Sequence, residues 1–157
     1  MSPEFSESTK KRLDEVIARY PKKKAALLPI LHLVQQEIGF ISSAEEKQVA
    51  DLLGINPIQV REVVTFYTMY NRQPVGKYHI QVCSNLSCSL LGAQILVDYL
   101  KEKIGIELGE TSEDKKFTLT TVECLGACEH APCMMVNYDY WGNLDQNRID
   151  EILDKLE

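Results

Sequence analysis

Two closely spaced pairs of cysteines are the part of this sequence whose residue types could do chemistry. Four residues separate Cys83 from Cys88, and three separate Cys124 from Cys128. Two thiolates in one short loop can hold the same metal atom, as they do in zinc sites and in iron–sulfur proteins. The spacing therefore predicts a metal centre to which each pair contributes two sulfur ligands.

Four such thiols can form disulfides, bind structural zinc or hold a [2Fe-2S] cluster. The first residues of the chain, MSPEFSESTKKR, contain no apolar segment typical of a secretion signal, so we expect a cytoplasmic protein. The cytoplasm keeps ordinary thiols reduced, which disfavours disulfides. Zinc and the cluster each accept four cysteines, so the spacing alone leaves both open.

The residues between the cysteines favour the cluster moderately. The two loops read CSNLSC and CLGAC, with no charged side chain between their cysteines. Small residues let the backbone approach a bulky cluster and direct N–H groups at its sulfurs, which tunes such centres. A helix predicted to begin at Leu90 would also direct its positive end toward the site. A zinc site uses the same donors, so zinc remains an alternative.

Two further residues near the second pair could bind a metal. Cys133 follows Pro132 and precedes an apolar segment, so we expect a buried free thiol there rather than a ligand. His130 could replace a cysteine as in Rieske-type centres, but four cysteines already complete the ligand set. Both are therefore left out of the predicted site.

The first 70 residues have the apolar periodicity of helices, interrupted by residues that end them. We expect four helices: one ended by Pro21, a second ended by Gly39, a third from a capping box of Ser43 and Glu46 to Gly54, and a fourth that starts at Asn56-Pro57 and buries Val60, Val63, Val64 and Tyr67.

From about Gln73 the pattern changes to a mixture of strands and helices. Strands are expected over 77–82, 117–122 and 134–138, helices over 90–104 and 149–156, and a turn over 141–143. Each cysteine pair follows one of the first two strands. If these strands are neighbours in one sheet, both loops leave the same edge and the four sulfurs can converge. The expected fold class is α+β, with a helical bundle over 1–70 and an α/β domain over 71–157.

Composition excludes several other functions. The net charge of −6 argues against a general affinity for nucleic acid, and the longest apolar stretch, over 25–34, is far shorter than the roughly 20 residues of a membrane helix. None of the eight glycines forms a dinucleotide-binding or P-loop motif, and no H-E-x-x-H is present. An electron-carrying centre without a substrate site implies a partner that does the chemistry.

Three segments carry a resemblance to a known family. They are VVTFYTMY (63–70), HIQVCSNLSCSLLGA (79–93) and VECLGACEHAPCMMVN (122–137). In these the chain resembles the small [2Fe-2S] subunit of the NADH-dehydrogenase module of respiratory complex I, the E-subunit family of NADH-quinone oxidoreductase. The resemblance implies a thioredoxin-like domain after the helical bundle. It also implies the cluster ligands Cys83, Cys88, Cys124 and Cys128, with Cys133 excluded.

The resemblance also implies partners. Such a subunit docks on a flavoprotein that binds FMN and NADH, and its cluster exchanges single electrons with the FMN within a larger complex. The complex lies on the cytoplasmic face of the inner membrane, so this chain would meet the membrane only indirectly. Similar subunits serve NAD-linked formate dehydrogenases and hydrogenases, so the resemblance does not decide which of these enzymes is the parent complex. The aromatic residues Phe66, Tyr67 and Tyr70 next to the domain boundary predict that residues 1–70 dock the partner.

A protein of another class is the second hypothesis. The third and fourth expected helices, joined by Gly54-Ile55-Asn56, resemble a helix-turn-helix. Together with a cluster, this motif would make a redox-sensing DNA-binding protein. The would-be recognition helix, over 57–70, has Arg61 as its one basic residue and is otherwise strongly apolar. We therefore expect it to pack against protein. A zinc-stabilised adaptor is a third possibility if the metal is zinc.

Overall fold

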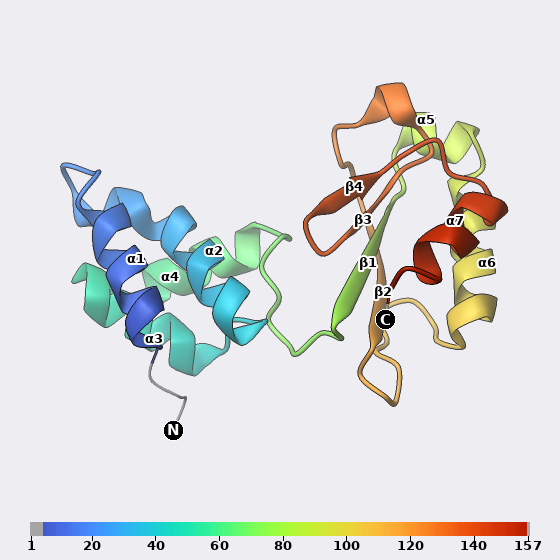
Figure 1. The fold of residues 1–157 in the computed structure, drawn as a ribbon. Helices are drawn as coiled ribbons and strands as arrows, with labels where there is room; N and C mark the ends of the chain where they lie inside the picture. The colour runs from blue at the N-terminus through green and yellow to red at the C-terminus, as the bar shows by residue number, and fades with distance from the viewer. Residues whose placement is uncertain (1–4, 157) are drawn as a thin grey trace. The chain divides into compact units, whose positions relative to one another are not determined.

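The computed structural model describes residues 5–156, and the chain divides into two compact units, one ending at Pro74 and the other starting at Val75. Each unit has its own core, and each is described by itself (Figure 1). The first four residues of the polar N-terminal segment lie outside the described part. Within residues 5–156, no helix is both long enough and apolar enough to cross a membrane.

The first unit is a bundle of helices, drawn from blue to green in Figure 1. Its core is apolar and includes Leu13, Ile30 and Val49. Its described residues contain four α-helices and a short 3-10 helix: α1 (Glu7–Ile17), η1 (Lys23–Ala26), α2 (Leu27–Ile38), α3 (Ser43–Leu53) and α4 (Pro57–Phe66). The expected four helices are confirmed, but the first ends at Ile17 and not at Pro21.

Helix ends in the bundle follow from local residue chemistry. Gly39 and Gly54 end α2 and α3 with φ values of 90° and 66°, a left-handed conformation that costs glycine little. Asn56 caps α4 by accepting the Ile58 N–H at 3.0 Å, and Pro57 occupies the first helical position, where no N–H is needed. The predicted helix boundaries at these residues are confirmed.

The predicted capping box of α3 is wrong by one residue. Ser42 is the cap: its hydroxyl accepts the Ala44 N–H at 3.1 Å, and its own N–H donates to the Glu45 carboxylate at 2.8 Å. Two overlapping Ser-x-x-Glu pairs compete for this role, and only the first places its glutamate where it can reach the cap. Glu46 is also buried, and it has another partner.

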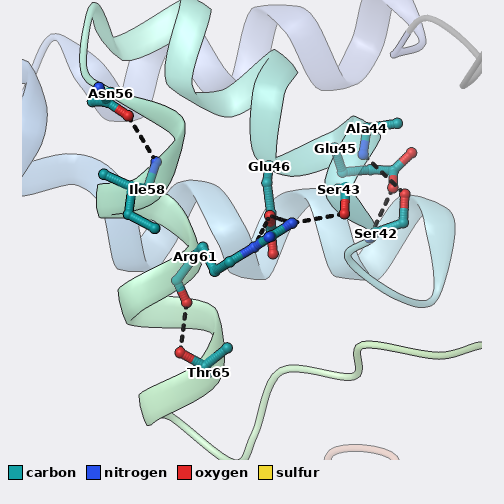
Figure 2. A network of polar contacts seen from close by, with 9 residues as sticks. All are labelled: Ser42, Ser43, Ala44, Glu45, Glu46, Asn56, Ile58, Arg61 and Thr65. Atoms are coloured by element: carbon teal, nitrogen blue, oxygen red, sulfur yellow. Dashed lines mark hydrogen bonds and ion pairs between the residues drawn. The ribbon is translucent and has the colours of Figure 1, made fainter.

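That partner is Arg61 of α4, as Figure 2 shows. Its Nε donates to the Glu46 carboxylate at 2.9 Å, and its terminal nitrogen donates to the Ser43 hydroxyl at 2.8 Å. The guanidinium therefore ties α3 to α4 and is already engaged by a buried carboxylate. A recognition helix needs its basic side chains free for phosphates, so this contact counts against the helix-turn-helix hypothesis.

The predicted buried face of α4 is only partly right. Val60 and Val64 are buried and Val63 packs at the edge of the core, but Tyr67 lies beyond the last turn of the helix and is 38% exposed. Tyr70 is the aromatic residue that enters the core, where its hydroxyl donates to the Leu28 carbonyl at 3.0 Å.

The second unit is a four-stranded sheet in the order β2-β1-β3-β4 with helices beside it (Figure 1). The central strand β1 pairs in parallel with β2 and antiparallel with β3, which forms a hairpin with β4. The strands are β1 (Tyr78–Cys83), β2 (Phe117–Val122), β3 (Met134–Val136) and β4 (Asp139–Trp141). The helices are α5 (Leu86–Leu90), α6 (Ala93–Ile104), η2 (Cys128–His130) and α7 (Gln146–Leu153).

Three expectations for this unit are corrected. The closing helix, expected over 149–156, spans Gln146–Leu153, so Leu156 lies beyond its end. The helix expected over 90–104 is divided by Gly92 at φ 87°, so that Cys88 lies inside the short α5 rather than before a longer helix. A helix that begins at Leu90 and directs its N-terminus at the site is therefore not present. The strand expected over 134–138 stops at Val136, because Asn137 adopts φ 55° and turns the chain into β4, which includes Trp141 of the expected turn.

The arrangement of β1 and β2 meets the condition for convergence of the cysteine loops. The two strands are parallel neighbours, with Cys83 opposite Val122 at their carboxyl ends. Both cysteine loops therefore leave the same edge of the sheet. Because β3 runs antiparallel to β1, with Met134 opposite Val82, the residue before it lies at this edge too.

Candidate metal centre

Three segments of the chain are held together at this edge by backbone hydrogen bonds. The Cys83 N–H donates to the Cys133 carbonyl at 3.1 Å, and the Ser84 N–H donates to the Val122 carbonyl at 2.9 Å. The end of β1 thus lies between the end of β2 and the start of β3. All five cysteines lie at the end of β1, after it, after β2 or just before β3.

Three buried sulfurs meet here. Cys83, Cys88 and Cys133 are at most 2% exposed, and their sulfur atoms all lie within 4.8 Å of one another. The sulfurs of Cys88 and Cys133 are 3.7 Å apart. Cys133 is a buried free thiol, as expected, but its contact with the two predicted ligands does not follow from the sequence pattern.

The second predicted pair lies in an exposed loop. Cys124 and Cys128 are exposed, and neither belongs to the group of three sulfurs. Gly126, with φ 71°, turns this loop so that its N–H donates to the Cys124 sulfur at 3.3 Å. An N–H group directed at a cysteine sulfur is the arrangement that stabilises a metal-bound thiolate.

The two cysteine loops meet at the sulfur of Cys83. Burial raises the pKa of this thiol, but the backbone N–H groups of Asn85 and Leu125 point at the sulfur, and the net shift of the pKa is downward. Asn85 belongs to the first loop and Leu125 to the second. One sulfur therefore receives donors from both loops, which favours its thiolate form.

The other two buried thiols are shifted the opposite way. Burial raises the pKa of Cys88, although the Cys133 N–H counteracts it. Burial, together with the neighbouring sulfur of Cys88, raises the pKa of Cys133 to about 12. A metal ion that bound these sulfurs would displace the protons of the thiols.

The end of the hairpin supports the second loop. A Cβ added to Gly142 would lie 2.8 Å from the His130 carbonyl oxygen and closer still to the His130 side chain. The Asn143 N–H donates to the same carbonyl at 2.6 Å. Only glycine lets the hairpin approach the turn that carries Cys128 so closely. The sequence predicted a turn that includes Gly142. The contact of Gly142 with His130 forms only in the folded chain and was not predicted.

The donor set fits a [2Fe-2S] cluster. Four cysteines in two loops at one sheet edge can supply two thiolates to each iron, and backbone N–H groups point at three of the sulfurs. The family profile described as thioredoxin-like [2Fe-2S] ferredoxin matches residues 13–157. The chain belongs to this family. The expected fold class and type of cofactor are thereby confirmed, and the relatives described next confirm the resemblance carried by the three sequence segments.

Relatives of this ferredoxin family match nearly the whole chain. The NADH-quinone oxidoreductase E 2 subunit of Rhizobium meliloti (strain 1021) is 43% identical over 94% of this chain and 88% of its own length. The corresponding E subunit of Rickettsia conorii is 44% identical over 92% and 88%. NADH dehydrogenase [ubiquinone] flavoprotein 2 of Dictyostelium discoideum is 39% identical over 98% of this chain and 64% of its own.

A solved structure shares the fold at low sequence identity. The NAD+-reducing [NiFe]-hydrogenase in the air-oxidized state aligns with a TM-score of 0.71 and 21% identity. The alignment covers 83% of this chain but only 22% of the hydrogenase chain, so this ferredoxin corresponds to about a fifth of that chain.

Proposed function

We propose that this chain is the electron-transfer subunit of an NADH:quinone oxidoreductase. The observation that carries the proposal is the meeting of the two cysteine loops at one sheet edge, in a chain that spans most of the length of its bacterial oxidoreductase relatives. The cluster, when bound, supplies a site for one electron at a time. The enzyme activity belongs to the assembled complex, because this chain shows no substrate-binding motif of its own.

Cys83 and Cys88 hold one iron in this proposal, and Cys124 and Cys128 hold the other. Support comes from the first pair, whose sulfurs lie within 4.8 Å of each other, and from the N–H groups directed at Cys83 and Cys124. The first pair is buried and the second is exposed. A partner's redox centre can therefore approach most closely on the side of the second loop.

The partner in this proposal is a flavoprotein that binds FMN and NADH, and residues 1–70 dock it. The end of α4 supports the docking role: Phe66 is 76% exposed, and Tyr67 and Met69 are exposed beside it. Large apolar side chains grouped on a surface mark protein contacts. The resulting complex lies on the cytoplasmic face of the inner membrane, and this chain meets the membrane only through it.

A cluster-bearing subunit of an NAD-linked hydrogenase or formate dehydrogenase is the second candidate. It remains from the sequence resemblance, because the likeness to the NAD+-reducing hydrogenase, at 21% identity, shows the fold alone. Both candidates place the chain beside an NAD-linked flavoprotein, so they differ in the parent complex rather than in the chemistry of this chain. Isolation of the native complex by a tag on this chain separates them, when it is followed by assays of quinone reduction with NADH and of NAD+ reduction with hydrogen or with formate.

The cofactor is tested by metal analysis. Anaerobically purified protein should contain two irons and two acid-labile sulfides per chain and only traces of zinc. Stoichiometric zinc without sulfide would overturn the redox function and leave the zinc-stabilised adaptor.

Docking is tested by two variants on the same helix. Phe66→Asp places a charge in the exposed group at the end of α4, and Ile58→Asp does so at an exposed position, 55% accessible, in its first turn. We expect Phe66→Asp to weaken binding to the flavoprotein at least tenfold and Ile58→Asp to leave it nearly unchanged. Equal binding by both variants would remove this surface from the interface.

A further inference from the structure

The group of Cys83, Cys88 and Cys133 has the dimensions of a site for a single metal ion. Sulfurs bound tetrahedrally to one ion, at a metal–sulfur distance of about 2.3 Å, lie about 3.8 Å apart. The sulfurs of Cys88 and Cys133 are 3.7 Å apart, and the third sulfur lies within 4.8 Å of both. Small side-chain rotations would bring all three sulfurs onto one ion.

The backbone holds this spacing in place. Cys83 and Cys133 are joined by the hydrogen bond from the Cys83 N–H to the Cys133 carbonyl, at 3.1 Å. Cys88 is fixed by the short helix α5, and the Cys133 N–H points at its sulfur. Donors also point at the Cys83 sulfur from Asn85 and Leu125. These N–H groups would orient and stabilise metal-bound thiolates.

The surroundings of the three sulfurs are apolar. Ala93 is buried with them, and Leu125, Ala127 and Ala131 pack against the group. Three thiolates in such surroundings are costly unless a cation compensates their charge. Zinc and similar thiophilic divalent ions would cancel two of the three negative charges, and the N–H groups directed at the sulfurs would stabilise the rest. Such ions accept three protein ligands and a fourth from water.

We propose that Cys83, Cys88 and Cys133 form a three-thiolate site that binds one Zn²⁺-like ion when the cluster is absent. The ion shares Cys83 and Cys88 with the cluster, so the two occupants exclude each other. Cys133 belongs to the ion's site alone, and Cys124 and Cys128 belong to the cluster's site alone. Binding releases the thiol protons to solvent. The sharing of two cysteines rests on the proposed cluster ligands, whereas the three-sulfur site itself does not.

Cobalt titration of the cluster-free full-length chain tests this proposal. Co²⁺ substitutes for Zn²⁺, and in a thiolate site it gives sulfur-to-metal charge-transfer absorption that can be followed directly. The variants are Cys133→Ala, which removes a ligand of the proposed site, and Cys128→Ala, its matched control in the exposed loop. We expect one Co²⁺ per chain in the unchanged protein and in Cys128→Ala, and at least tenfold weaker binding in Cys133→Ala.

Unchanged Co²⁺ affinity in Cys133→Ala would overturn the proposal, as would an equal loss in Cys128→Ala. Misfolding of Cys133→Ala is checked by reconstituting it with iron and sulfide, because the cluster does not use the missing sulfur and should assemble fully. Absence of a cluster from the reconstituted, unchanged protein would instead contradict the proposed function. The two failures are therefore distinguishable.

Discussion

The sulfur of Cys133 lies 3.7 Å from the sulfur of Cys88, close enough for one thiol to donate a hydrogen bond to the other. Cys88 is a predicted cluster ligand and Cys133 is not. A fifth cysteine therefore touches the proposed centre without belonging to its ligand set. This contact arises because β3 runs antiparallel to β1 and begins at the edge where β1 ends.

Removing this contact should change the reduction potential and leave the cluster in place. A hydrogen bond to a ligand sulfur favours the reduced cluster, which carries more negative charge. Cys133→Ala should therefore lower the potential by about 20–40 mV, the equivalent of a weak hydrogen bond for a one-electron couple. A redox titration followed by electron paramagnetic resonance measures this, and an unchanged potential would show that the hydrogen bond is absent in the loaded protein.

Gly142→Ala should loosen the second cysteine loop. Its new methyl group would overlap His130, and relieving the overlap should cost about 1–3 kcal/mol of the free energy of unfolding. The turn that carries Cys128 would be displaced, so the cluster should also be lost faster in air. Absorbance of the cluster over time measures this. Tyr140→Ala, at an exposed position of β4, is the control and should behave like the unchanged protein.

Arg61→Ala should destabilise the helical bundle. The substitution leaves the Glu46 carboxylate buried without its charged partner. Because Arg61 is about half exposed, we expect a loss of about 1–2 kcal/mol, less than for a fully buried pair. Urea unfolding of the metal-free chain measures it. Lys47→Ala, at an exposed position of α3, is the control and should change stability by less than about 0.5 kcal/mol. Equal losses in the two variants would show that the ion pair of Arg61 with Glu46 does not stabilise the bundle.

The bundle and the cysteine loops were predictable to different degrees. Gly39, Gly54 and Asn56-Pro57 mark helix ends through local backbone chemistry, so the sequence located them. The parallel pairing of β1 and β2 also agrees with the expected convergence of the cysteine loops. Where two caps compete, as at Ser42 and Ser43, local chemistry does not decide, because the choice depends on the contact of Glu46 with α4.

Features that depend on contacts between distant residues were missed. The place of Cys133 beside Cys88 follows from the pairing of β3 with β1, and the need for Gly142 follows from its contact with His130. The β3–β4 hairpin was missed because its turn uses Asn137 with positive φ, a conformation that asparagine adopts only in some contexts. None of these is visible in periodicity or spacing.

Stability should fall as the solution becomes acidic because of two histidines, the buried His79 and the half-buried His32. Burial lowers the pKa of His79 and of His32 below 6.5, so protonation favours the unfolded chain. Their stabilising contribution is complete above pH 6.5 and is lost as the pH falls through that value toward the folded-state pKa.

His79→Gln should reduce this dependence without removing it, because His32 remains. The glutamine can retain a hydrogen bond to Thr120, which lies 2.8 Å from the histidine ring nitrogen. Urea unfolding of the metal-free chain at about pH 7.5 and about pH 5.5, on either side of the unperturbed histidine pKa, measures the effect. An identical pH dependence in the variant and the unchanged protein would show that His79 does not titrate in this range.

Electron paramagnetic resonance of the reduced protein tests the four-cysteine ligand set most directly. The unchanged protein and Cys133→Ala should both show the spin-half signal of a reduced [2Fe-2S] cluster with the same number of spins per chain. Cys128→Ala should lose that signal or show altered g-values as another ligand replaces the missing sulfur. A full, unaltered signal in Cys128→Ala together with its loss in Cys133→Ala would contradict the ligand set and place Cys133 on the cluster.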